Sequence, residues 1–147
     1  MSEGKDLCAF CRTQPPTSNE EQIKRAKNLM DKGNAEAFNM LAGLHSHGEL
    51  GLTQDYQKAN ELWLKGGELG CAEAYYNLGI AYYQGDGVEI DTKKAKHYFE
   101  LAAMNGHIKA RHNLGCKELE AGNYQQAFKH LVLAASAGYK DSLYLVK

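Results

Sequence analysis

The most restrictive feature of this sequence is a motif that recurs about every 36 residues. At 72–79 the chain reads AEAYYNLG, and related segments stand at 35–42 and 108–115. A second motif repeats in step with the first, at 55–59, 91–95 and 123–127. Each unit closes on a glycine, at Gly33, Gly70, Gly106 and Gly138. A period of this length is typical of stacked helical arrays, in which each unit packs mainly against its neighbours.

Apolar spacing within each unit predicts two helices. Ala74, Leu78 and Ala81 follow the i, i+4, i+7 spacing of one helix face, and the segment from Ala95 to Ala102 follows the same rule. Helices are therefore expected at about 19–32, 35–47, 56–69, 72–84, 92–105, 108–121, 124–137 and 140–146. No segment alternates with period two, so no strand is expected. The predicted fold class is all-α, an α/α solenoid of stacked antiparallel helix pairs.

Short polar and small residues refine this prediction. Asp55, Asp91 and Asn123 each precede a predicted helix, where the side chain can accept the first unpaired backbone N–H groups. Gly79 and Gly115 stand inside two of the first helices. Because a bulky side chain would hold two helices apart, these glycines are expected where the paired helices approach most closely.

The charge balance excludes several classes of partner. Lys and Arg together number 17 and Asp and Glu number 18, which gives a net charge of −1. Such a chain has no basic field for a phosphate backbone and no cationic face for anionic lipids. No stretch approaches the ~18 apolar residues of a membrane span, and the polar N-terminus lacks a signal-peptide pattern. We therefore expect no nucleic-acid partner, no membrane association and a cytoplasmic location.

The middle unit resembles a Sel-one-like repeat, a helical unit related to the tetratricopeptide repeat. The resemblance rests on Ala74, Leu78, Gly79, Tyr82, Gly85, Gly87, Val88, Asp91, Ala95, Ala102, Ala103 and Gly106. The flanking units are looser copies, since His45 stands at the position of Tyr82 and the third unit lacks the glycine-rich loop. The resemblance implies a solenoid of the Sel-one-like type over nearly the whole chain.

This resemblance also divides the chain and implies a role. It separates an N-terminal segment, 1–18, from a repeat solenoid, 19–147. The solenoid comprises a half-unit at 19–33, repeats at 34–70, 71–106 and 107–138, and a partial capping unit at 139–147. Proteins of this kind hold other proteins and are not catalytic as a rule. The resemblance therefore implies a non-enzymatic scaffold or adaptor with a protein or peptide partner and no cofactor.

A second resemblance lies at the start of the chain. Cys8-Ala9-Phe10-Cys11 is similar to the last ligand pair of a RING-type zinc finger. A RING finger needs eight ligands for two zinc ions, and a lone pair fills two of the four positions around one ion. Zinc is therefore not expected in this chain. The pair is interpreted instead as a vestigial segment, and a redox C-x-x-C is the other alternative. The alternative function is the substrate-recognition part of a RING-type ubiquitin ligase whose finger is truncated or degenerate.

The remaining cysteines and histidines are expected to be structural. Cys71 opens a predicted helix, where the helix dipole can lower a thiol pKa. Its repeat position is shared by Asn34, His107 and Tyr139, which favours a structural role. Cys116 occupies a packing position, and no Cys–His or His–carboxylate arrangement is expected from these residues.

The expected binding surface follows from the repeat positions. The resemblance implies that the first helix of each pair lines the concave side of the array. With Leu78 buried, positions two before it and five after it are expected to point away from the core. These positions form two rows: Asn39, Tyr76 and His112 in one, and Ser46, Tyr83 and Leu119 in the other. The predicted peptide-binding residues are Asn39, Tyr76, Asn77, Tyr83, His112 and Asn113. In the alternative interpretation, Tyr76 and Tyr83 pack between neighbouring units.

Overall fold

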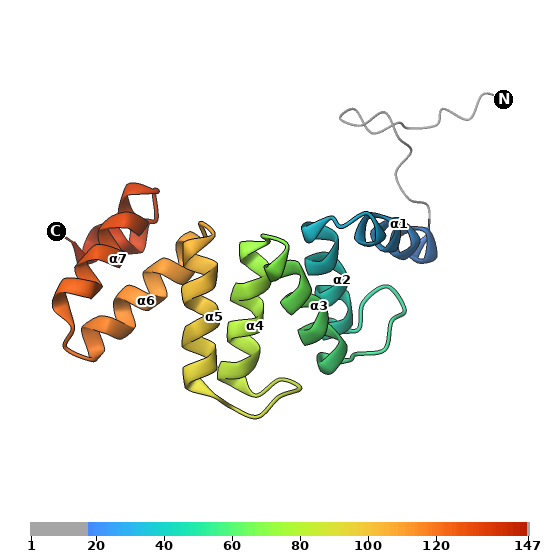
Figure 1. Cartoon of the computed structure of the whole chain (residues 1–147), viewed down its shortest axis with the longest axis horizontal. Helices are drawn as coiled ribbons and strands as arrows, with labels where there is room; N and C mark the ends of the chain where they lie inside the picture. Colours follow the sequence, from blue (N-terminus) through green and yellow to red (C-terminus); the bar gives the residue numbers. More distant parts are fainter. Residues whose placement is uncertain (1–17, 147) are drawn as a thin grey trace, which may run out of the picture.

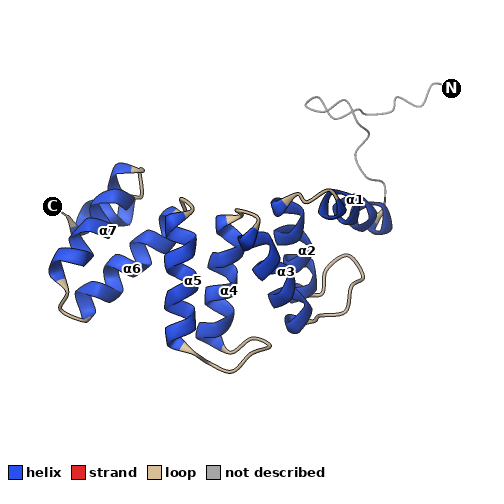
Figure 2. Ribbon diagram, in the orientation of Figure 1, coloured by secondary structure: helices blue, strands red, loops and turns tan. Residues whose placement is uncertain are grey.

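The computed structural model describes residues 18–146, and their regular structure is entirely helical (Figures 1 and 2). The helices are α1 (Asn19–Asp31), α2 (Ala35–His47), α3 (Tyr56–Glu68), α4 (Ala72–Gln84), α5 (Thr92–Met104), α6 (Ile108–Glu120), α7 (Tyr124–Ser136) and α8 (Lys140–Leu145). Each bound lies within about one residue of its expected position, which is the precision of such assignments. The prediction of an all-α chain is confirmed.

The helices pack as pairs that follow one another along the chain. The most extensive contacts join α2 to α3, α4 to α5, and α6 to α7. Successive pairs stack through α3 against α4 and α5 against α6. Figure 1 shows the pairs succeeding each other along the long axis, with α1 beside α2 at one end. The fold is the expected α/α solenoid, and none of its described helices is long and apolar enough to cross a membrane.

Side-chain caps fix where most helices begin. The carboxylates of Asp55 and Asp91 each accept the backbone N–H three residues later, both at 3.0 Å. Asn34 caps α2 in the same way, at 3.1 Å. The prediction for Asn123 is wrong, because its side-chain amide donates to the Glu118 carboxylate at 2.7 Å and leaves α7 without a side-chain cap.

Glycines on the first helices allow the paired helices to approach closely. A methyl group at Gly79 would lie 2.7 Å from the Phe99 ring, and one at Gly115 would lie 2.6 Å from Leu131. Both distances are shorter than ordinary carbon–carbon contacts. Phe99 and Leu131 are buried, so neither side chain has free space into which it can retreat. The expectation that these glycines mark the closest approach is confirmed.

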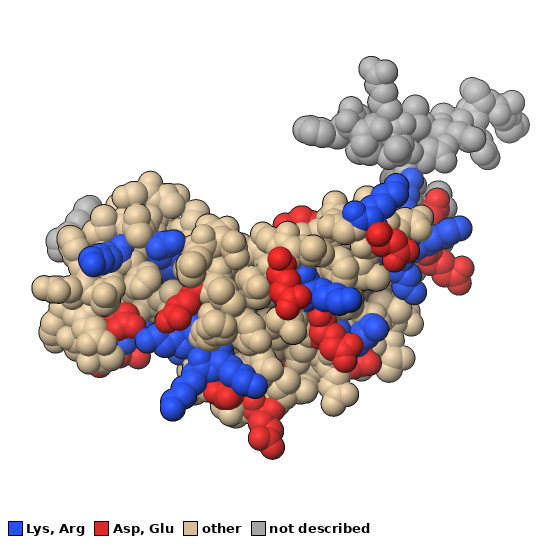
Figure 3. Space-filling model, in the orientation of Figure 1, with Lys and Arg blue, Asp and Glu red and all other residues tan. Residues whose placement is uncertain are grey.

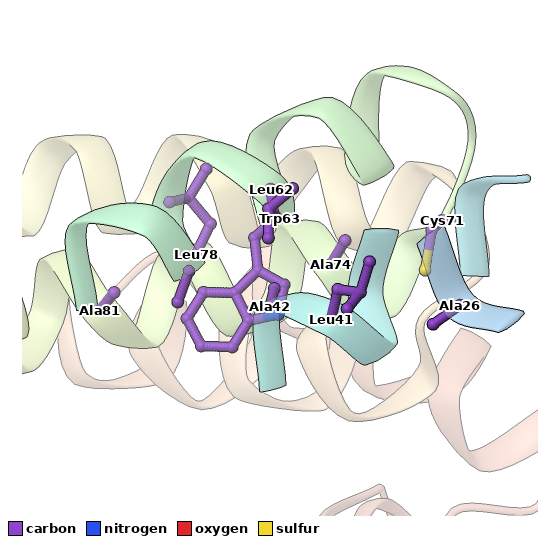
Figure 4. Close-up of a cluster of buried hydrophobic side chains, with 10 residues drawn as sticks. Ala26, Leu41, Ala42, Leu62, Trp63, Cys71, Ala74, Leu78 and Ala81 are labelled. Carbon is purple, nitrogen blue, oxygen red and sulfur yellow. The ribbon is translucent and has the colours of Figure 1, made fainter. Parts of the chain in front are cut away.

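The core runs along the array instead of forming one centre. Figure 4 shows the first cluster, in which Trp63 lies among small and aliphatic side chains from α1 to α4. A second cluster continues it through α4, α5 and α6, and includes Tyr76, Phe99 and Leu114. Leu78 and Leu114 are each 2% exposed, as their shared repeat position predicts. Helix α4 contributes to both clusters and is therefore covered by two units.

The glycine-rich loop after α4 folds back on the preceding repeat. Asn60 of α3 donates its side-chain amide to the backbone carbonyl of Asp86 at 2.8 Å. Gly87 has a φ of +72°, and a methyl group there would lie 2.6 Å from the Cβ of Tyr56. Both the backbone conformation and the lack of space require glycine at this position. The loop thus holds Asp86 beside the C-terminal turns of the first helices.

Leu78→Ala is expected to lower the free energy of unfolding by about 2–5 kcal/mol, because it leaves a cavity in the first core cluster. The loss should reach the neighbouring repeats, since each unit is stabilised by its neighbours. Chemical denaturation followed by circular dichroism measures this change. Leu69→Ala is the control, because Leu69 is 52% exposed and should change stability by less than about 0.5 kcal/mol. Equal midpoints for the two variants would show that the core is assigned wrongly.

Two glycine substitutions are expected to act in opposite directions. Gly43→Ala should raise the free energy of unfolding by about 0.5–1 kcal/mol, because alanine is the better helix former and the new methyl meets no atom within 4 Å. Gly79→Ala offers the same helix gain but forces the Phe99 ring to move, at a cost of about 1–3 kcal/mol. A net loss is expected. Thermal and urea unfolding of both variants checks the signs, and a stabilised Gly79→Ala would contradict the close approach.

Candidate functional site

The first helices of successive pairs contact one another directly. Helix α2 packs against α4, whereas α3 and α5 form no comparable contact. The Asn77 amide donates to the Asn39 carbonyl oxygen at 3.2 Å, and the Asn113 amide donates to the Tyr76 hydroxyl at 3.4 Å. Because the elements that lie closer together occupy the inside of a curved stack, we infer from the contact of α2 with α4 that the first helices lie on the inner side of this array.

Two hollows lie side by side along this inner side. One, of about 390 Å³, lies between α2 and α4 and is lined by Ser46, Asn77 and Asp86 among others. The other, of about 420 Å³, lies between α4 and α6 and is lined by residues that include Tyr83 and Phe99. Ile80 and Gln84 of α4 line both hollows, so the two hollows adjoin on either side of these residues. We call the residues lining the two hollows the inner groove.

Four of the predicted binding residues line the inner groove, and three of them, Tyr83, Asn77 and Asn113, do so with exposed or half-buried side chains. Tyr83 is 52% exposed and stands on the last turn of α4. Asn77 and Asn113 are half-buried and line one hollow each. Asn39 is also half-buried and reaches the groove through its hydrogen bond to Asn77. The structure therefore brings Asn39 and these three residues to the inner side.

Tyr76 packs between neighbouring units, as the alternative interpretation predicts, and the expectation that it points away from the core is wrong. Its side chain is 7% exposed, stacked on the His107 ring at 4.3 Å and packed against the Phe99 ring at 5.5 Å between centroids. The reason is that α4 is sandwiched, so the face two residues before Leu78 meets the next unit. The Tyr76 hydroxyl still meets Asn113 at the groove wall.

His112 connects α6 to α8. Its Nδ1 lies 2.7 Å from the Ser142 hydroxyl, and its ring packs against Tyr139 with centroids 4.7 Å apart. Its Nε2 lies 3.4 Å from the Cys116 sulfur. The structure therefore assembles a Cys–His pair, contrary to expectation. The i, i+4 spacing of His112 and Cys116 on one helix is the signal that could have found it.

The Cys116 thiol is not activated by this neighbour. Burial raises its pKa, and the nearby carboxylates of Glu120 and Asp141 raise it further. A nucleophilic cysteine needs the opposite, a lowered pKa and a thiolate. The pair therefore has the geometry of a hydrogen-bonded contact without the electrostatics of a nucleophile.

The structure indicates no reactive cysteine or metal site elsewhere among the described residues. Cys71 is 2% exposed, and burial raises its pKa, in agreement with the structural role expected for it. Cys8 and Cys11 lie outside residues 18–146. Within 18–146, no group of three or more His, Cys, Asp or Glu side chains is arranged to hold a metal ion.

Lys117 is a groove residue that the sequence analysis missed. Its ammonium lies 4.7 Å from the Tyr83 ring centroid and 6.0 Å from that of Phe99. The sequence signal that could have identified it is the change of residue type, because the same position holds Leu44 and Ala81 in the other two units.

On the face of the molecule in Figure 3, basic and acidic side chains are interspersed and form no single-sign surface.

Solved structures share this architecture. A Sel1 repeat protein from Oxalobacter formigenes is 27% identical, with a TM-score of 0.74, over 84% of this chain and 51% of its own. The protein c5321 is a protective antigen of uropathogenic Escherichia coli with an SLR fold. It is 26% identical, with a TM-score of 0.77, over 89% of this chain and 28% of its own.

Curated relatives are much longer than this chain. Chitin synthase regulatory factor 2 from Schizosaccharomyces pombe is 32% identical over 65% of this chain and 20% of its own length. The ERAD-associated E3 ubiquitin-protein ligase component HRD3B from Arabidopsis thaliana is 35% identical over 76% of this chain and 17% of its own length. The chain thus spans about a fifth of the length of these relatives or less.

The repeat units themselves match a family model. The Sel1 repeat model matches three consecutive segments, 35–71, 72–107 and 108–139, which together make up most of the chain. Each matched segment contains one first helix and one second helix of the solenoid. The chain belongs to the Sel1 repeat family.

Proposed function

We propose that this chain is a non-catalytic scaffold that binds an extended peptide segment of a protein partner in the inner groove. Sel1 repeat proteins serve as protein-interaction scaffolds. The observation that carries the proposal is the pair of adjoining hollows at two successive repeat boundaries, which share Ile80 and Gln84. A groove that crosses boundaries presents a row of sites at the spacing of the repeats, which suits an elongated ligand.

The amide groups along the groove support recognition of a peptide backbone. Asn77 uses its amide nitrogen on Asn39, which leaves the Asn77 carbonyl oxygen and the Asn39 amide nitrogen for a ligand. One acceptor and one donor side by side complement the N–H and C=O groups of an extended chain. Exposed Tyr83 adds apolar area together with a polar hydroxyl, a combination enriched where proteins bind one another.

The chemistry of the groove favours binding over catalysis. The Cys116 thiol lines one hollow, and its raised pKa disfavours the thiolate. The Ser46 hydroxyl lines the other hollow, but it is 4% exposed and donates to the Gly43 carbonyl at 2.9 Å. Catalysis by a thiol would require a thiolate and a donor set for the developing charge. The groove groups described above are instead hydrogen-bonded to one another, which suits a pre-organised binding surface.

A second candidate function rests on one relative. The Arabidopsis protein is a component of an ERAD-associated E3 ubiquitin-protein ligase, and its similarity to this chain extends over 112 residues. By analogy, this chain would act as the part of a ligase assembly that holds a substrate or another subunit. The inner groove would serve the same purpose in that setting, so the two candidates differ in the partner and share the surface.

Tyr83→Ala is expected to weaken partner binding by at least about tenfold, because it removes the most exposed aromatic ring of the groove. Partners captured from a lysate are identified by mass spectrometry, and their affinities are then measured by calorimetry. Tyr124→Ala is the matched control, since Tyr124 is 71% exposed on α7 and lies away from the groove. Both variants should keep the parent melting temperature. Equal binding by both would place the partner elsewhere.

Tyr76→Phe tests the groove wall without emptying the core. It removes the hydroxyl that accepts from Asn113 and keeps the buried ring in place. We expect a stability loss of about 1 kcal/mol or less, together with a modest loss of affinity, because Asn113 is no longer held. Thermal unfolding and calorimetry measure the two effects. A large loss of stability with unchanged affinity would make Tyr76 a purely structural residue.

Zinc content tests whether Cys8 and Cys11 belong to a complete zinc site. The purified chain is expected to carry well under one zinc ion per molecule, because Cys8 and Cys11 supply two of the four ligands of a structural site. Helix content should survive treatment with a chelator. Elemental analysis and circular dichroism provide the measurements. One tightly held zinc ion per chain would contradict this expectation and support the zinc-finger interpretation of Cys8 and Cys11.

A further inference from the structure

Lys117 has an unusual environment for a surface lysine. It is half-buried on the last turn of α6, and its ammonium faces the rings of Tyr83 and Phe99. Within residues 18–146, no carboxylate oxygen lies within 4.0 Å of it, whereas Lys96 is paired with Glu118 at 2.9 Å. The groove therefore contains a cation whose close neighbours are aromatic faces.

The repeat position of Lys117 makes this environment more informative. The equivalent residues are Leu44, which is half-buried, and Ala81, which is 2% exposed. Packing alone would thus favour a small or apolar side chain here. Aromatic faces stabilise a half-buried ammonium group only in part. A carboxylate stabilises it more strongly, because it accepts a charge-assisted hydrogen bond. The missing carboxylate can come from a ligand in the groove.

The other residues that line the hollow between α4 and α6 indicate which kinds of peptide residue can bind beside the carboxylate. Ile80, Phe99 and Tyr83 line it with apolar surface next to Lys117. Glu120 lines the same hollow, and Asp86 lines the adjoining one. These two carboxylates disfavour a run of acidic residues, because like charges would meet along the groove. A single acid with apolar and neutral neighbours fits the charges best.

We propose that Lys117 binds the side-chain carboxylate of one Asp or Glu in an extended peptide, with an apolar residue of that peptide against Tyr83 and Phe99. This inference rests on the proposed function, because it specifies the ligand of the same groove. It assigns the Lys117 ammonium as the donor, and the neighbouring rings as the wall that orients the peptide.

The test uses an arrayed library of random peptides with amidated C-termini, probed with the full-length chain. Each bound peptide is then synthesised as a matched pair in which its acid is Glu or Gln, and affinities are measured by fluorescence anisotropy. We expect bound peptides to share one acid at a fixed distance from an apolar residue. The Glu form should bind the parent chain about tenfold more tightly than the Gln form. The preference should weaken as salt concentration rises.

Lys117→Gln should abolish this preference, and Lys117→Arg should retain it. Lys109→Gln is the matched control, because it removes the same charge from the same helix. Lys109 also faces a tyrosine, at 5.8 Å from the Tyr76 centroid, but does not line the inner groove. Circular dichroism establishes that each variant is folded. A Glu preference that survives Lys117→Gln, or that disappears in Lys109→Gln, overturns the inference.

Two further outcomes separate this inference from the function on which it rests. If peptides bind, lose affinity in Tyr83→Ala and show no Glu preference, the groove is a binding site and the role of Lys117 is wrong. If bound peptides are unaffected by Tyr83→Ala and by Lys117→Gln, the groove itself is wrong. Peptides with free C-termini form a further arm. A preference confined to that arm would identify a terminal carboxylate and overturn the side-chain assignment.

Discussion

The close contact between a small residue on the first helix and a large side chain on the second determines the geometry of each repeat. Gly79 faces Phe99 and Gly115 faces Leu131 with no room for a methyl group. In the first repeat, Ala42 occupies the equivalent position and is fully buried. Because this contact brings the two helices together, it also determines which faces remain for stacking. The stacked faces form the continuous core, and the inner groove is what the stacking leaves uncovered.

Stacking explains why two tyrosines on one face of α4 have different environments. Tyr76 and Tyr83 are two turns apart, yet one is 7% exposed and the other 52%. His107, which begins the next first helix, covers Tyr76 near the start of α4. Near the end of α4, Lys117 approaches the Tyr83 ring from α6 and leaves it half open to solvent. The groove is therefore most accessible at the C-terminal turns of the first helices.

The helices could be predicted closely because their signals are local and recur in every unit. Leu78 and Leu114 were assigned to the core from one shared position, and both are buried. Contacts between units could not be predicted in the same way, because they depend on the rotation of one helix against the next. This is why the burial of Tyr76 against His107 could be stated only as an alternative, and why the contact of His112 with Ser142 was missed. The contact of His112 with Cys116 lies within α6, and its local spacing was overlooked.

The comparison of repeat positions also indicates where specificity must arise. Residues that recur in all three units, such as the leucine at the position of Leu78, are occupied by packing and are the same at every boundary. Such residues form the groove, but they do not make one part of the groove differ from another. Positions that differ between units do make its parts differ, and Lys117 and Tyr83 both differ from their counterparts. Both line the hollow between α4 and α6. A ligand that contacts that hollow would therefore meet side chains that are specific to this part of the array, which gives it a means to distinguish this chain from another array of the same fold.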